Sequence, residues 1–140
     1  MINKNYLAGF LDGEGCITII KHIHKKDNKT YSEYQGVIVV ANSNKKILRE
    51  FKMRWGGNIY VGMELKPHHK IRYSWRLSSK SATKVCEDLV SKVFIKKRHM
   101  GILIELQSMK INKGKRSEEV IKRQDRLFFE IRKLNKRGIK

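Results

Sequence analysis

The stretch YLAGFLDGEG, residues 6–15, most constrains the fold, because the backbone must change structure within a few residues. Its apolar half predicts a short helix over residues 5–11, and Gly13 or Gly15 predicts the end of that helix. The next residues, CITIIKHIH (16–24), alternate in polarity and predict a strand with one buried face. The chain therefore runs from a helix directly into a sheet, and two carboxylates lie at the junction.

Strands and helices continue to alternate along the rest of the chain. We expect a polar loop over 27–33, a strand over 34–41 and a helix from Asn42–Asn44 to Trp55. A hairpin follows, with strands over 58–65 and 71–78 and a turn at Lys66–His69. The rest of the chain predicts a helix capped by Ser79 or Ser81, a helix from about Lys96, a basic loop over 112–116 and a last helix over 117–136. In the first strand, Ile17, Ile19 and Ile23 share the side that we expect to be buried. This order predicts one α+β domain over 1–140, with helices on one face of antiparallel strands.

The charge of the chain indicates its partner. The 140 residues contain 32 Lys and Arg against 13 Asp and Glu, a net charge of +19, and 40% are hydrophobic. Such a charge favours a polyanion, with nucleic acid ahead of an anionic membrane surface. No apolar run approaches the roughly 20 residues of a membrane span. Two distant cysteines, Cys16 and Cys86, favour a reducing intracellular setting, and an organelle, a phage and a prokaryotic host are all compatible.

The first helix carries small residues away from its apolar stripe. Gly9 and Gly13 lie four apart with Ala8 beside them, a spacing that lets two helix backbones approach closely. A second copy packed there would bring two Glu14 side chains together, where carboxylates repel unless a cation lies between them. Carboxylate and carbonyl oxygens suit Mg²⁺, which also binds phosphate. The sequence therefore predicts a homodimer that holds Mg²⁺ at Glu14.

The nine residues 7–15, LAGFLDGEG, resemble the LAGLIDADG motif of homing endonucleases, with Phe10, Gly13 and Glu14 as conservative changes. The strand directly after the motif and the αββαββα order expected from periodicity match the same family, so the resemblance covers most of the chain. A single motif implies a homodimer acting on a long, near-palindromic site in double-stranded DNA. The implied activity is site-specific hydrolysis of both strands with Mg²⁺, leaving 3′ overhangs.

The resemblance also implies roles for motif residues. Glu14 falls on the acidic metal-ligand position, assisted by the carbonyl of Gly13, and Asp12 on the residue that caps and orients the motif helix. The helix itself is expected in the dimer interface, at Leu7, Ala8, Gly9, Asp12 and Gly13.

A second set of residues resembles the family's basic active-site stretch. In VSKVFIKKRHM (90–100), Lys96 falls on the position of the active-site lysine, with Lys97 as the alternative. Asn42 and Lys46 align with polar residues that organise active-site water. Together with Glu14, these residues complete the predicted catalytic set.

The polar side of the strands is the expected DNA surface, since a polar sheet face in a chain of charge +19 suits a nucleic-acid groove better than mere solvation. The predicted base-reading residues are Thr18, Ile20, His22, His24, Gln35, Asn58, Tyr60, Arg72, Ser74 and Arg76. Lys113, Lys115 and Arg116 in the basic loop are expected to contact phosphates. Two rival functions use the same scaffold: an RNA-binding intron maturase, and a DNA-binding regulator without cleavage.

Overall fold

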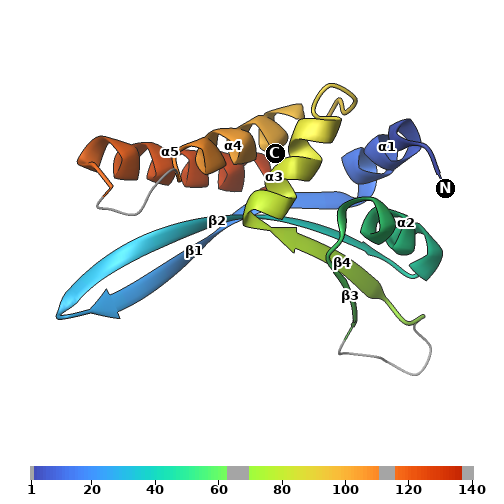
Figure 1. Cartoon of the computed structure of the whole chain (residues 1–140), viewed down its shortest axis with the longest axis horizontal. Coiled ribbons are helices and arrows are strands. Elements are labelled where there is room, and N and C mark those ends of the chain that lie inside the picture. The colour runs from blue at the N-terminus through green and yellow to red at the C-terminus, as the bar shows by residue number, and fades with distance from the viewer. Residues whose placement is uncertain (1, 63–69, 111–115, 137–140) are drawn as a thin grey trace.

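The computed structural model describes residues 2–62, 70–110 and 116–136, and in these residues helices cover one face of a four-stranded sheet (Figure 1). The strand order is β1-β2-β4-β3, and each neighbouring pair is antiparallel. The strands are β1 (Gly15–Lys26), β2 (Lys29–Asn42), β3 (Asn58–Val61) and β4 (Tyr73–Ser78). The helices are α1 (Lys4–Glu14), α2 (Lys45–Trp55), α3 (Ser79–Leu89), α4 (Lys97–Ser108) and α5 (Glu118–Leu134). The α+β architecture expected from the sequence is confirmed.

The hairpin of β1 and β2 is longer than the sequence suggested. The polar stretch 27–33 was expected to be a loop, but only Asp27 and Asn28 turn, with φ of 51° and 63°, and Lys26 pairs with Lys29. Both residue types tolerate positive φ, which a two-residue hairpin turn requires. Residues 29–33 are polar because this part of the strand is solvated, and not because it leaves the sheet.

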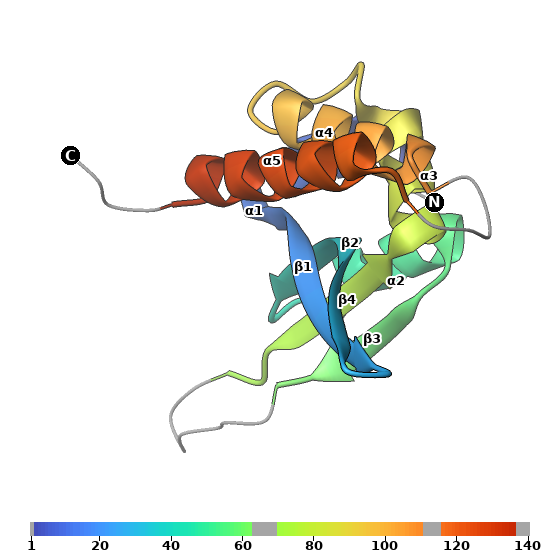
Figure 2. The ribbon, with the colours of Figure 1, turned by 90° about the vertical axis from the view of Figure 1, so that its left-hand side faces the viewer.

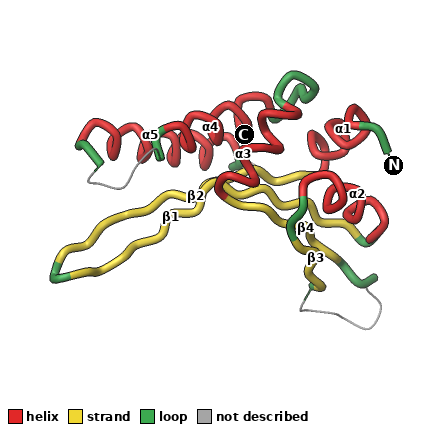
Figure 3. Tube along the Cα trace, in the orientation of Figure 1, coloured by secondary structure: helices red, strands yellow, loops and turns green. Residues whose placement is uncertain are grey.

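The core lies between the helices and the inner half of the sheet. Trp75, Phe51, Ile17 and Leu48 are fully buried there. Figure 3 shows that the helices lie on one side of the strands, while the β1–β2 hairpin extends beyond α2 and α3. Ile23, expected beside Ile17 in the core, is therefore 65% exposed.

Four boundaries differ from the sequence-based expectation. α1 continues to Glu14, so both carboxylates of the motif belong to its last turn. β4 begins at Tyr73, which leaves Ile71 45% exposed, and β3 ends at Val61. The N-cap of α3 is Ser78 and makes no side-chain capping bond, so neither predicted cap is correct. The predicted turn at 66–69 lies outside the described residues.

α5 packs across β1 and α4 and forms side-chain bonds to β2 and α4 (Figure 2). The Tyr34 hydroxyl donates to Asp125 at 2.5 Å, and burial together with this carboxylate raises the pKa of Tyr34 to about 12. Arg98 of α4 binds both carboxylate oxygens of Glu130, at 2.5 and 2.7 Å. These contacts fix the last helix over the outer part of the sheet.

Candidate active site and nucleic-acid interface

The two sides of α1 have different environments. Leu7, Ala8 and Leu11 are fully buried in the core of their own chain. Gly9 and Gly13 are exposed, and a Cβ built on either would meet no atom within 4 Å. The free side of α1 is therefore the glycine side. Leu7 and Ala8, which were predicted at a dimer interface, instead face inward, since the apolar stripe of a helix packs against its own sheet.

Asp12 has a role that the sequence did not reveal. Its Oδ2 accepts from the backbone N–H groups of Phe94 and Ile95, both at 3.0 Å, and its Oδ1 accepts from that of Lys96 at 2.8 Å. We call these three bonds the Asp12 clamp. Burial would raise the pKa of Asp12, but the three N–H donors and the nearby Lys96 charge outweigh it and hold the pKa below its ordinary value. Asp12, predicted to cap the motif helix and to lie in a dimer interface, therefore fixes the loop before α4.

The clamp also places the predicted lysine. The Nζ of Lys96 donates to the carbonyl oxygen of Asp12 at 3.0 Å, at the end of α1. Lys97 is exposed and is the first residue of α4. Of the two lysines considered, Lys96 is thus the one whose ammonium group contacts the motif helix.

Glu14 is the last residue of α1 and its side chain is exposed. The chain turns sharply into β1 at Gly15, where a Cβ would lie 2.4 Å from Leu11 Cδ1 and 2.6 Å from Leu11 O. Glycine is required there by the close approach within the same chain, whatever binds outside it. The carboxylate of Glu14 is consequently presented at the junction of α1 and β1, beside the free glycine side.

Asn42 and Lys46 lie near that junction. Gly15 pairs with Val40, so Asn42 lies at the same end of the sheet, two residues further along β2. The Oδ1 of Asn42 accepts from the N–H of Asn44 at 2.7 Å and thereby forms the turn into α2. Lys46 follows the N-cap Asn44 and is exposed. Asn42 therefore has a clear structural role, beside any contact with water.

The strand register places the predicted base-reading residues on one face. Residues directly opposite each other in an antiparallel pair share a face. The opposed pairs include Thr18 with Val37, Ile20 with Gln35, His22 with Glu33, His24 with Tyr31, Asn58 with Arg76 and Tyr60 with Ser74. Arg72 follows in the same alternation, and its carbonyl accepts from Gly62 N at 2.7 Å. We call this side, opposite to the helices, the open face. In Figure 1 the two hairpins slope away from the centre, so the open face is concave along the sheet.

Several side chains on the open face bind each other. His22 Nε2 lies 3.1 Å from Gln35 Oε1, and Gln35 Nε2 donates to Ser79 Oγ at 3.2 Å. His24 Nε2 lies 3.0 Å from Glu33 Oε2. Sequence reasoning missed Glu33 because residues 27–33 were expected to be a loop. The alternation of Lys29, Tyr31 and Glu33 with their neighbours was the available signal.

The predicted phosphate contacts of the basic loop receive no support. Arg116 donates to Ser32 O at 2.5 Å and to Gln124 Oε1 at 2.6 Å, so its guanidinium group joins α5 to β2. Both bonds direct the side chain toward the rest of the chain, and the phosphate contact of Arg116 stays a prediction. Lys113 and Lys115 lie outside the described residues.

A separate buried network connects three elements near the motif. The Nε2 of His99, in α4, lies 3.0 Å from Asn135 Oδ1, and Asn135 Nδ2 donates to Ile17 O at 2.8 Å. Since the Asn135 amide donates to a carbonyl, its oxygen faces His99, whose Nε2 must carry the hydrogen. His99 Nδ1 is buried without a partner among the described residues. Burial lowers the pKa of His99, and Lys96 adds to this effect against the opposing Asn135 bond.

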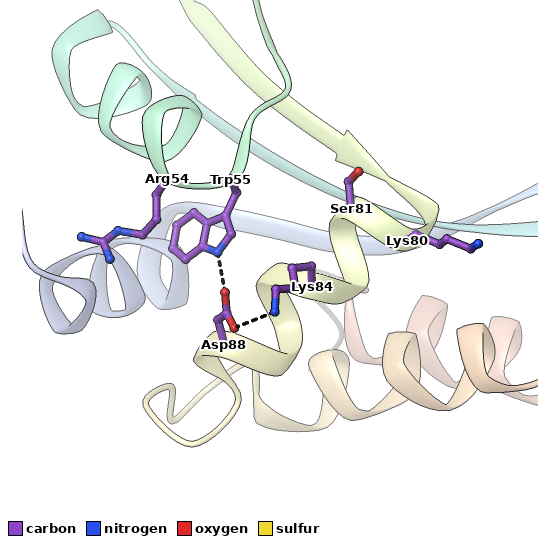
Figure 4. A pocket seen from close by; sticks show the side chains of 6 residues that line it. All are labelled: Arg54, Trp55, Lys80, Ser81, Lys84 and Asp88. Atoms are coloured by element: carbon purple, nitrogen blue, oxygen red, sulfur yellow. Dashed lines mark hydrogen bonds and ion pairs between the residues drawn. The ribbon is translucent and has the colours of Figure 1, made fainter.

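A cavity of about 360 Å³ lies between the end of α2 and one side of α3, on the helix side of the sheet (Figure 4). Its wall includes Trp55, whose Nε1 donates to Asp88 at 2.8 Å, and Lys84, whose Nζ lies 3.8 Å from the same carboxylate. None of the predicted site residues lines this cavity. The candidate site is therefore the α1–β1 junction with the open face.

The chemistry that one chain offers to a metal is limited. In residues 2–62, 70–110 and 116–136, no three His, Cys, Asp or Glu side chains gather as a metal site. Glu14 with a nearby backbone carbonyl would fill only part of the octahedral shell that Mg²⁺ takes, but both are hard oxygen ligands of the right type. Within the same residues, no helix has the length and apolar character to cross a membrane.

Comparison with known proteins identifies the family. The model of the LAGLIDADG endonuclease family matches residues 7–104. No curated protein matches the sequence. The homing endonuclease I-CvuI, solved with the I-CreI target DNA and Mg, is 18% identical with a TM-score of 0.72, covering 97% of this chain and 83% of that one.

Two further solved structures have the same fold. The archaeal intron-encoded homing endonuclease I-Vdi141I, solved with DNA, is 19% identical with a TM-score of 0.70, covering 96% of this chain and 85% of that one. I-GzeII, a LAGLIDADG homing endonuclease solved with its DNA target, is 18% identical with a TM-score of 0.58, covering all of this chain but only 47% of that one. The motif, its helix-to-strand junction and the family match over most of its length show that this chain belongs to the LAGLIDADG endonuclease family.

Proposed function

We propose that the chain, acting as one domain over 1–140, is a homing endonuclease that cuts both strands of a specific DNA site as a homodimer. One observation carries the proposal: Lys96 donates to the carbonyl of Asp12 in the last turn of α1, and the exposed Glu14 ends that turn, at one end of the concave open face. This arrangement brings together hard oxygen ligands, the positive charge of Lys96 and one end of a concave sheet face.

The open face is the proposed DNA surface. A two-stranded ribbon fits the major groove of B-DNA, where each base pair presents a distinct pattern of donors and acceptors. The exposed residues on this face include His22, Asn58, Tyr60, Arg72 and Arg76. I-CvuI and I-Vdi141I, whose fold the chain shares, were both solved with DNA.

The free side of α1 is the proposed dimer interface. Gly9 and Gly13 allow close packing of two helices. Beside α1, the loop held by the Asp12 clamp exposes Phe94 by 90% and Ile95 by 65%, an apolar surface that a second copy would cover. The chain spans about half of I-GzeII, which agrees with one copy being half of a complete unit.

The proposed chemistry is metal-assisted hydrolysis of a phosphodiester. Mg²⁺, when bound, would lower the pKa of a water and neutralise charge on the scissile phosphate. Glu14 of each copy would ligate it, assisted by the Gly13 carbonyl, and the pairing of two carboxylates at the interface favours a cation between them. Lys96, fixed by the clamp, would place its positive charge close to the developing negative charge. Asn42 and Lys46 would order water at the same end of the sheet.

Cleavage of a plasmid library that carries randomised near-palindromic sites, in Mg²⁺ or in EDTA, tests this function. We expect double-strand breaks with 3′ overhangs in Mg²⁺ alone. Glu14→Gln should abolish cutting while DNA binding persists, and Glu119→Gln, on the exposed surface of α5, is the matched control. Cutting by Glu14→Gln would contradict the role of Glu14. Specific binding by the unmodified chain without cutting would favour a DNA-binding regulator, and RNA binding without DNA binding a maturase.

A further inference from the structure

The open face carries one carboxylate among its strand residues. Opposed pairs place the even-numbered residues of β1 and the odd-numbered residues of β2 on this face, from Cys16 with Val39 to Lys26 with Lys29. Within β1 to β4 as described, Glu33 is the only acid in these positions. A carboxylate is unexpected on a surface that would bind phosphates, so it requires a physical reason.

Two neighbours hold Glu33 in place. Its Oε2 lies 3.0 Å from His24 Nε2, and the His24 ring stacks on Tyr31 with 5.1 Å between ring centroids. The side chain of Glu33 remains 60% exposed, so it can reach a ligand. An exposed contact of this kind contributes little to stability even when both groups are charged, and the contact with His24 therefore does not explain the acid by itself.

The acceptor character of Glu33 selects its DNA partner. A carboxylate only accepts hydrogen bonds, and cytosine presents the N4 amino donor at the major-groove edge. Adenine offers an N6 donor as well, but its N7 acceptor lies beside it and would repel the second carboxylate oxygen. Guanine and thymine offer no such donor on that edge. A carboxylate that DNA binding would cover and leave without a donor also penalises the wrong base.

We infer that Glu33 reads one cytosine in each half of the DNA target, and that His24 and Tyr31 position its carboxylate. This inference rests on the proposed function, because it assumes that the open face enters the major groove. It adds a specificity-determining residue and a base identity that the resemblance to the family does not supply.

The substitution Glu33→Gln gives a directional test. Glutamine keeps the shape and can accept from His24, but it can both donate and accept, the combination that suits adenine N6 and N7. Binding would be measured in EDTA against DNA libraries randomised over the target. We expect the unmodified chain to prefer cytosine at one symmetric pair of positions, and Glu33→Gln to change that preference to adenine by about ten-fold or more.

Two controls make the test specific. Glu119→Gln makes the same chemical change on α5, away from the open face, and should leave every preference unchanged. Tyr31→Leu removes the ring that stacks on His24 and should weaken the cytosine preference without creating one for adenine. Identical base preferences for the unmodified chain and Glu33→Gln would overturn the inference. Absence of any sequence preference in the unmodified chain would contradict the proposed function itself, and this inference with it.

Discussion

The two ends of strand β1 differ in how firmly their surroundings are held. At the inner end, the Asp12 clamp, the Lys96 bond to Asp12 O and the Asn135 bond to Ile17 O join α1, α4 and α5 to the first residues of the strand. At the outer end, the hairpin extends beyond α2 and α3, and the His24 side chain binds Glu33 of the same hairpin on the open face. The difference teaches that the residues proposed for chemistry are held in one geometry, while those proposed for recognition lie where substitution disturbs little.

The largest expected effect comes from filling the free side of the inner end. Gly9→Leu should raise the stability of the single chain slightly, because glycine costs roughly 0.5–1 kcal/mol in a helix. It should prevent close packing of two copies, since overpacking costs about 1–3 kcal/mol at each of two symmetric positions. Analytical ultracentrifugation should show monomers, and Mg²⁺-dependent cutting should be lost.

Gly101→Leu is the matched control for that variant. A Cβ at Gly101, in α4, also meets no atom within 4 Å. If Gly9→Leu remained dimeric and active, the proposed interface on α1 would be wrong.

Breaking the Asp12 clamp should have the next largest effect. Asp12→Asn turns an amide donor towards backbone N–H groups and leaves at least one of them without an acceptor. We expect a loss of roughly 1–3 kcal/mol in the free energy of unfolding, with a clear fall in cutting because Lys96 is released. Urea unfolding and cleavage rates measure the two effects.

The same change at the outer end sharpens the comparison. Asp27→Asn, in the hairpin turn, keeps a residue type that tolerates positive φ. It should change neither the free energy of unfolding nor the cleavage rate. Equal effects of Asp12→Asn and Asp27→Asn would show that the inner end is not specially held.

A smaller effect is expected for a single recognition residue. Arg76 is exposed and lies opposite Asn58 on the open face. Arg76→Ala should relax base preference at one symmetric pair of positions by about 1–3 kcal/mol and leave stability unchanged. Binding to randomised DNA measures this, with Lys122→Ala on α5 as control, and equal weakening on all sequences would identify Arg76 as a phosphate contact.

The smallest effect concerns pH. Burial lowers the pKa of His99 below its ordinary value of 6.5, so the unfolded chain takes up a proton at higher pH than the folded chain. The stability is therefore complete above about pH 6.5 and declines as the pH falls through the lowered pKa. Urea unfolding at several pH values should show a slope below pH 6.5 that His99→Gln reduces. An unchanged slope in His99→Gln would contradict this account.

The element order could be predicted from the sequence because periodicity reports burial. The alternation after residue 15 and the helical stripe of Ile47, Leu48 and Phe51 gave the strands and α2, and the open face followed from the polar positions. Less could be predicted where local patterns are ambiguous. Residues 29–33 are polar on both sides, so periodicity did not separate a solvated hairpin from a loop.

The features of the candidate site also separate into those set by nearby residues and those set by the tertiary structure. Local sequence determined the helix-to-strand junction at Gly15, Glu14 beside it and the family motif, since each depends on residues within about ten positions. Tertiary structure alone decided that Asp12 binds backbone groups 82 to 84 residues away, that Arg116 turns inward, and that Glu33 meets His24. The reason is physical: a hydrogen bond depends on where the folded backbone brings two groups, and no spacing along the chain encodes a partner so distant.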